Sequence, residues 1–98
     1  IAAIWRERPK ADAGATTGAV SAVHIHESGR YAQFDLKPDN GGPVYRYSPR
    51  WRGGMPRDGG GPERAVVDAI KGLKPGQRVR VQWIFETRMR AVKIERVQ

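Results

Sequence analysis

The residues of this chain with the clearest potential chemistry lie in residues 45–61, which read YRYSPRWRGGMPRDGGG. This segment contains four arginines, two tyrosines, one tryptophan and five glycines, and Asp58 is its one carboxylate. Proteins that bind single-stranded nucleic acid combine a positively charged groove with aromatic rings on which bases stack. Glycine and proline are equally typical of a connecting loop. The segment therefore predicts either a binding loop or a connection that Trp51 anchors to the domain.

Further basic and aromatic residues fall on the polar faces of predicted strands elsewhere in the chain. In an OB-fold the usual binding face is formed by the second and third strands and the loops beside them. The predicted surface for a single-stranded nucleic acid or another polyanion comprises Tyr31, Lys37, Arg46, Arg50, Trp51, Arg52, Arg57, Arg78 and Arg80. The opposing interpretation is that the arginines are merely solvated and that Trp51 covers one end of the fold, since tryptophan usually buries much of its area.

Two other motifs have the residue types for a bound ion. His24 and His26 would point the same way from a strand, but a zinc site needs a third ligand, and the chain has no cysteine. The glycines at 59–61 precede a predicted helix, where backbone N–H groups can face a phosphate. No Lys-Ser or Lys-Thr pair of the P-loop type follows them. We predict no metal site, no cofactor and no nucleotide hydrolysis.

No constellation of residues predicts an enzyme. The serines at 21, 28 and 48 have no evident His-Asp partnership, and the sequence contains no Gly-x-Ser-x-Gly motif. The spacing of the acidic residues does not indicate a pair of carboxylates in a cleft. The sequence therefore predicts a protein that binds rather than one that catalyses.

The bulk composition favours one small domain with a basic surface. The chain has 98 residues, 18 Lys and Arg against 10 Asp and Glu, a net charge of +8 and no cysteine. Such a charge raises the local concentration of anionic partners. No apolar run approaches the roughly 20 residues that span a bilayer. The compartment stays open between the cytoplasm and export, since neither a disulfide framework nor a complete signal peptide is visible.

Three short strands are predicted before the arginine-rich loop, which spans residues 49–61. Valine and isoleucine recur through residues 18–27, and a change of register between Val20 and Val23 indicates a β-bulge. Residues 30–37 alternate between apolar and polar side chains, as in a strand with one wet face. Residues 44–48 form the third predicted strand.

A helix and a hairpin are predicted after the loop. Pro62 suits the first helical position because its missing N–H is not needed there. Apolar residues then recur through residues 66–73 at the spacing of one helix face. Residues 77–86 alternate as a strand, and residues 90–97 complete a hairpin with it. The predicted core comprises Phe34, Leu36, Val67, Ile70, Val79, Val81, Trp83 and Phe85, with Val92 and Ile94 from the last strand.

Five strands with a helix between the third and the fourth is the order of the OB-fold, a small, partly open barrel. We therefore predict an all-β fold with one helix, a five-stranded OB-like β-barrel over residues 18–98. An SH3-like barrel is the alternative if the helix shrinks to a turn. Residues 1–17 sustain no period and predict a flexible N-terminal arm, either a linker or the remainder of a cleaved anchor.

The segment at residues 47–95 resembles a group of small bacterial OB-like domains of unassigned function. The shared features are Tyr-x-Pro-x-Trp-x-Gly-Gly-x-Pro from residue 47, Gly-Gly-Gly before the helix, and Val-x-Val-x-Trp from residue 79. The resemblance covers most of residues 18–97 and implies one compact β-barrel domain of a kind often found in exported or envelope proteins. It brings no catalytic residues.

The leading functional hypothesis is a non-enzymatic module that binds an anionic partner, with single-stranded nucleic acid favoured. The alternative is a structural or protein-interaction domain of an exported or multi-domain bacterial protein, whose basic charge is incidental. The two hypotheses differ in whether the arginines converge on one face together with an exposed aromatic ring.

Overall fold

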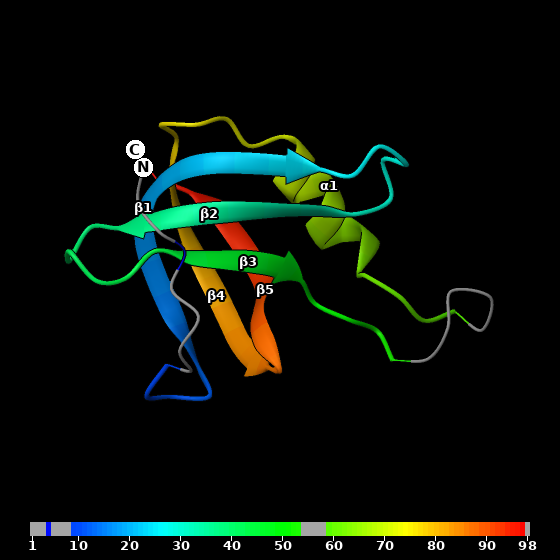
Figure 1. The fold of residues 1–98 in the computed structure, drawn as a ribbon, viewed down its shortest axis with the longest axis horizontal. Helices are drawn as coiled ribbons and strands as arrows, with labels where there is room; N and C mark the ends of the chain where they lie inside the picture. Colours follow the sequence, from blue (N-terminus) through cyan, green and yellow to red (C-terminus); the bar gives the residue numbers. More distant parts are fainter. Residues whose placement is uncertain (1–3, 5–8, 54–58, 98) are drawn as a thin grey trace.

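The fold is a closed barrel of five strands with one helix (Figure 1). The computed structural model describes residue 4, residues 9–53 and residues 59–97. The elements are β1 (Ala13–Ile25), β2 (Ala32–Pro38), β3 (Tyr45–Pro49), α1 (Arg64–Lys71), β4 (Arg78–Glu86) and β5 (Arg88–Arg96).

The strands close in the order β1-β2-β3-β5-β4. β3 and β5 run parallel, and the other neighbours are antiparallel. The predicted OB-like barrel with its helix between β3 and β4 is thereby confirmed. α1 has 8 residues, or about two turns, whereas the SH3-like alternative required a single turn in its place. Among the described residues, no helix is both long enough and apolar enough to cross a membrane.

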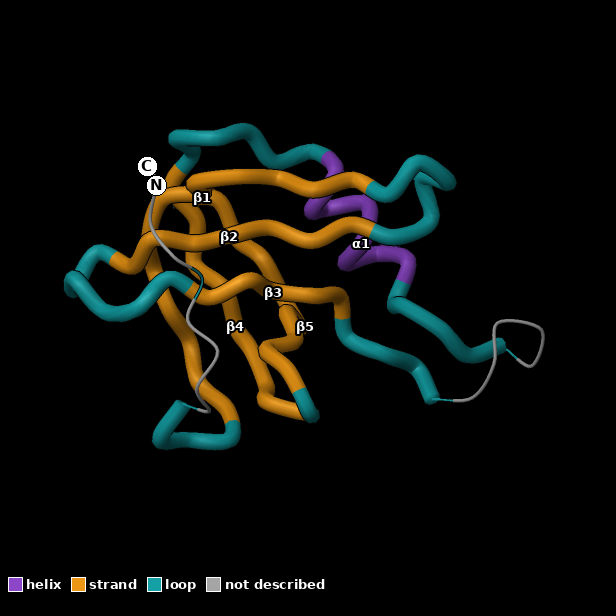
Figure 2. The backbone as a smooth tube through the Cα atoms, viewed as in Figure 1, coloured by secondary structure: helices purple, strands orange, loops and turns teal. Residues whose placement is uncertain are grey.

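β1 pairs with two neighbours along its length, and its path is curved (Figure 2). Residues 13–19 pair with β4, and residues 18–25 pair with β2. The two ladders overlap at Gly18 and Ala19. A Cβ atom at Gly18 would lie 2.2 Å from the carbonyl oxygen of Lys37. A register shift between Val20 and Ala22 confirms the predicted bulge. β1 begins at Ala13, earlier than the predicted start at Gly18. The prediction missed this part of the strand because small residues pair through their backbone without producing an apolar pattern.

The core lies inside the barrel and under α1. Val79, Val81, Phe34, Leu36 and the helix residues Val67 and Ile70 are all buried, as predicted. α1 also buries Val66, and Leu73 just beyond the helix is buried as well. Trp83 and Phe85 pack against this core but are only partly buried, which corrects their predicted full burial. Trp83 lies over Gly14, and its indole Nε1 donates a hydrogen bond to Thr16 Oγ1 at 3.0 Å.

The last strand contributes different residues from those predicted. Its buried apolar side chains are Met89 and Ala91, and Ile94 is only partly buried. Val81 pairs with Ile94 whereas Trp83 pairs with Ala91, so Val92 is the extra residue of a bulge. This bulge reverses the alternation in the first half of β5, and an unbroken period of two therefore predicted the wrong inward residues there.

α1 begins at Arg64, two residues later than predicted. Pro62 forms an isolated β-bridge with Trp51, and the backbone N–H of Glu63 donates to the Arg50 carbonyl at 2.7 Å. These contacts hold Pro62 and Glu63 in extended backbone, with Glu63 at φ −66° and ψ 118°. Pro62 is therefore part of the loop that leads to the helix.

Candidate functional site

The foot of the arginine-rich loop is an ordered structure, here called the loop stem and formed by residues 50–53 and 59–63. In addition to the bridge between Trp51 and Pro62, the Arg52 N–H donates to the Gly61 carbonyl at 2.7 Å. The Arg50 N–H donates to the Ala91 carbonyl at 3.1 Å, which joins the stem to β5. Backbone hydrogen bonds therefore fix where the stem presents its side chains.

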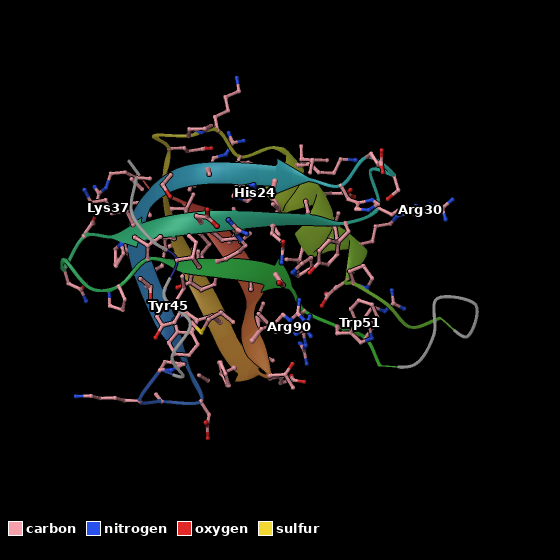
Figure 3. All side chains as sticks on the ribbon, in the orientation of Figure 1. His24, Arg30, Lys37, Tyr45, Trp51 and Arg90 are labelled. Carbon is pink, nitrogen blue, oxygen red and sulfur yellow. The ribbon has the colours of Figure 1, made fainter. Side chains whose placement is uncertain are left out.

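Trp51 lies on the surface of the stem rather than over the barrel core. It is 41% exposed, and the guanidinium carbon of Arg90 lies 5.9 Å from its ring centroid (Figure 3). That distance is at the outer limit of a cation–π contact. The Arg90 Nη1 also donates to the Pro49 carbonyl at 3.4 Å. An exposed aromatic ring thus stands beside an arginine of β5.

Arg50 and Arg52 flank Trp51 on the same segment. Both side chains are exposed, and neither forms an ion pair with a described residue. We call Arg50, Trp51, Arg52 and Arg90 the Trp51 patch. It combines three positive charges with one exposed ring, which are the two components that single-strand binders use. Arg57, which was predicted with them, lies outside the described residues.

Arg46 belongs to an ion-pair cluster on the outer face of β1, β2 and β3. Its Nε donates to Asp35 Oδ1 at 2.8 Å and its Nη2 to Asp35 Oδ2 at 3.3 Å. His24 Nε2 lies 3.1 Å from Asp35 Oδ2. Burial of the Asp35 carboxyl raises its pKa, but the hydrogen bonds and charges of Arg46 and His24 outweigh this, so the pKa lies below the ordinary value. Most of the positive charge of Arg46 is therefore compensated within the fold.

The two histidines of the predicted strand face different partners. β1 ends at Ile25, and His26 lies beyond it with Nδ1 2.8 Å from Ser28 Oγ. Within the part of the chain that the structure describes, no three metal-ligating side chains come together.

The other predicted site residues do not join the Trp51 patch. Lys37 is exposed near the end of β2, and Figure 3 shows it at the opposite end of the barrel from Trp51. Arg78 forms an ion pair with Asp39. Arg80 is exposed on β4, which is separated from β2 by β1 and from β3 by β5. Tyr31 is half-buried just before β2.

A small cavity lies away from the helix, among residues from all five strands and the loop between β2 and β3. Its volume is about 100 Å³. Ordinary ligand pockets enclose about 300–1,000 Å³, so this cavity has room for only a few atoms. Its lining residues include Thr16, Tyr45, Tyr47, Trp83 and Met89.

Arg90 is the residue of the patch that sequence reasoning missed. It lies beside Trp51 because β3 and β5 pair in parallel, with Ser48 opposite Arg90 and Pro49 opposite Ala91. The available signal was the OB-like order itself, since closing such a barrel brings the last strand against the third. Comparison of the chain with protein-family models, with curated proteins and with solved structures finds no match.

Proposed function

We propose that this domain is a non-enzymatic binding module for single-stranded nucleic acid, with the Trp51 patch as its contact surface. The observation that carries the proposal is an exposed tryptophan on a hydrogen-bonded stem, beside Arg90 and between two arginines that form no ion pair with a described residue. A base stacked on an aromatic side chain contributes about 1–3 kcal/mol, and every base offers such a face.

Ion pairs within the fold exclude some of the arginines from the proposed surface. Arg46 and Arg78 face Asp35 and Asp39, so their charges are already paired. Arg50 and Arg52 have no such partner among the described residues. When cationic side chains of a protein neutralise phosphate groups, the counterions bound to the nucleic acid are released. This release supplies most of the sequence-independent affinity of the protein for nucleic acid. The stem arginines therefore serve as the phosphate contacts in this proposal.

The test is an anisotropy titration with a labelled oligothymidylate of about 12 nucleotides, within the span of one OB-fold. It is repeated at several salt concentrations and with heparin as a polyanion without bases. Arg50→Ala and Arg52→Ala are each expected to weaken binding and to reduce the salt slope by about 0.7. Trp51→Ala is expected to weaken binding of the oligonucleotide with little change of slope, because stacking releases few counterions.

Arg80→Ala provides the matched control, since it removes the same charge from an exposed position on β4 outside the patch. At salt concentrations of about 0.1 M and above, where its charge is screened from the patch, it is expected to leave affinity and slope nearly unchanged. Equal losses for Arg80→Ala and Arg52→Ala would show that only the net charge matters. Failure of the unmodified domain to bind either polymer would favour the alternative of a structural or protein-interaction domain.

A further inference from the structure

The contacts that hold the Arg90 side chain are long. Its hydrogen bond to the Pro49 carbonyl is long at 3.4 Å, and its contact with Trp51 is 5.9 Å from the ring centroid. Its Nε is buried and has no acceptor among the described residues. A buried donor without an acceptor is unfavourable, so a conformation that gives this N–H an acceptor would be preferred.

The charge of Arg90 likewise has no compensating carboxylate among the described residues. No carboxylate of the described residues lies within ion-pair distance of its guanidinium. A guanidinium presents its N–H groups as a planar fork that matches two oxygens of a phosphate. The present contacts of Arg90 are therefore weaker than those that a phosphate would make.

We propose that Arg90 binds the phosphate of the nucleotide whose base stacks on Trp51, an inference that rests on the proposed function. The unit recognised by the patch is then one base together with its own phosphate. Arg90 exchanges its long bond to the Pro49 carbonyl for phosphate oxygens, and Nε gains an acceptor. Arg50 and Arg52 contact neighbouring phosphates along the strand.

The deciding variant is Arg90→Met, which keeps an unbranched apolar stem beside Trp51 and removes the charge. Binding to the same oligothymidylate is expected to weaken about tenfold, the effect of one charge-assisted contact. The salt slope is expected to fall by about 0.7, which identifies a lost phosphate contact. If Arg90 only supports the Trp51 ring, affinity changes but the slope stays at its original value, and the proposal is wrong.

Arg80→Met is the matched control, and at salt concentrations of about 0.1 M and above, where its charge is screened from the patch, it is expected to alter neither affinity nor slope. Arg90→Lys keeps the charge without the fork, so it is expected to preserve the slope while binding more weakly. If Arg90→Met does not fold, Arg90→Lys decides, because affinity equal to that of the unmodified domain would rule out a contact through the guanidinium fork. An unmodified domain that binds no oligonucleotide overturns the proposed function and this inference together, whereas an unchanged slope in Arg90→Met overturns this inference alone.

Discussion

Tyr47 is the largest side chain enclosed by the barrel, and its environment has a consequence for stability. It is 2% exposed, and its ring stacks on Phe34 with centroids 5.2 Å apart. Burial raises the pKa of Tyr47 to about 12, although a hydrogen bond with Thr16 acts in the opposite direction. The folded protein therefore retains the phenolic proton at a pH where the unfolded chain has lost it.

We expect this difference to destabilise the domain at alkaline pH. The contribution is complete below pH 10, the ordinary pKa of tyrosine, and is lost as the pH rises through about 12. A pKa difference of about 2 corresponds to about 3 kcal/mol. Urea unfolding at pH 8 and at pH 11.5 should show most of this loss in the unmodified domain and a smaller loss in Tyr47→Phe. Equal losses in both proteins would mean that another group governs alkaline unfolding.

At the scale of the elements, the Asp35 cluster connects three strands on their outer face. The Asp35 carboxylate on β2 pairs with Arg46 of β3 and His24 of β1, and the Asp35 side chain is only 7% exposed. Asp39 and Arg78 form a second pair whose side chains are 47% and 46% exposed. The two pairs share their chemistry but differ in solvation, so they provide an internal comparison.

We expect Asp35→Asn to lower the free energy of unfolding by about 1–3 kcal/mol at neutral pH, as for a lost hydrogen bond to a charged group. Because the pKa of Asp35 is lowered in the fold, its contribution is present above about pH 4 and is lost as the pH falls through the folded-state pKa. Asp39→Asn should cost at most about 1 kcal/mol. Chemical unfolding at pH 7 and pH 3 tests both, and the Asp35→Asn variant should show the flatter acid dependence. Similar costs at the two positions would contradict a special role for the buried carboxylate.

The elements with an uninterrupted local pattern were predictable from sequence. β2, β4 and the apolar face of α1 each present one side to the core, so their period appears in the residues themselves. The start of α1 was not predictable, because contacts with Trp51 and Arg50 hold the preceding residues extended. The inward residues of β5 depend on a bulge, and the position of Arg90 depends on pairing with a distant strand. These contacts join residues that are distant in the sequence, so a local sequence pattern does not reveal them.

At the scale of the whole molecule, the net charge of +8 affects the Trp51 patch over a distance that depends on the salt concentration. The domain measures 40 × 27 × 24 Å along its principal axes. Charges are screened over about 10 Å at 0.1 M salt and about 30 Å at 0.01 M salt. Lys37 and Arg80, outside the patch, should therefore influence binding only when little salt is present.

The corresponding prediction concerns the double variant Lys37→Glu with Arg80→Glu. Two reversals change the net charge by 4, from +8 to +4. Oligonucleotide affinity is expected to fall clearly at 0.01 M salt and to approach that of the unmodified domain at 0.15 M salt. A large loss that persists at 0.15 M would indicate that the bound strand extends to one of these residues.

The loop stem has a further consequence for how this domain can diversify. Its two sides are joined by backbone hydrogen bonds, which do not depend on the side chains of the residues that connect them. Doubling the length of a flexible loop costs only about 0.6 kcal/mol. Because the stem is closed on both sides of residues 54–58, we expect a peptide of another sequence between Gly53 and Gly59 to leave Trp51 and Arg90 in place.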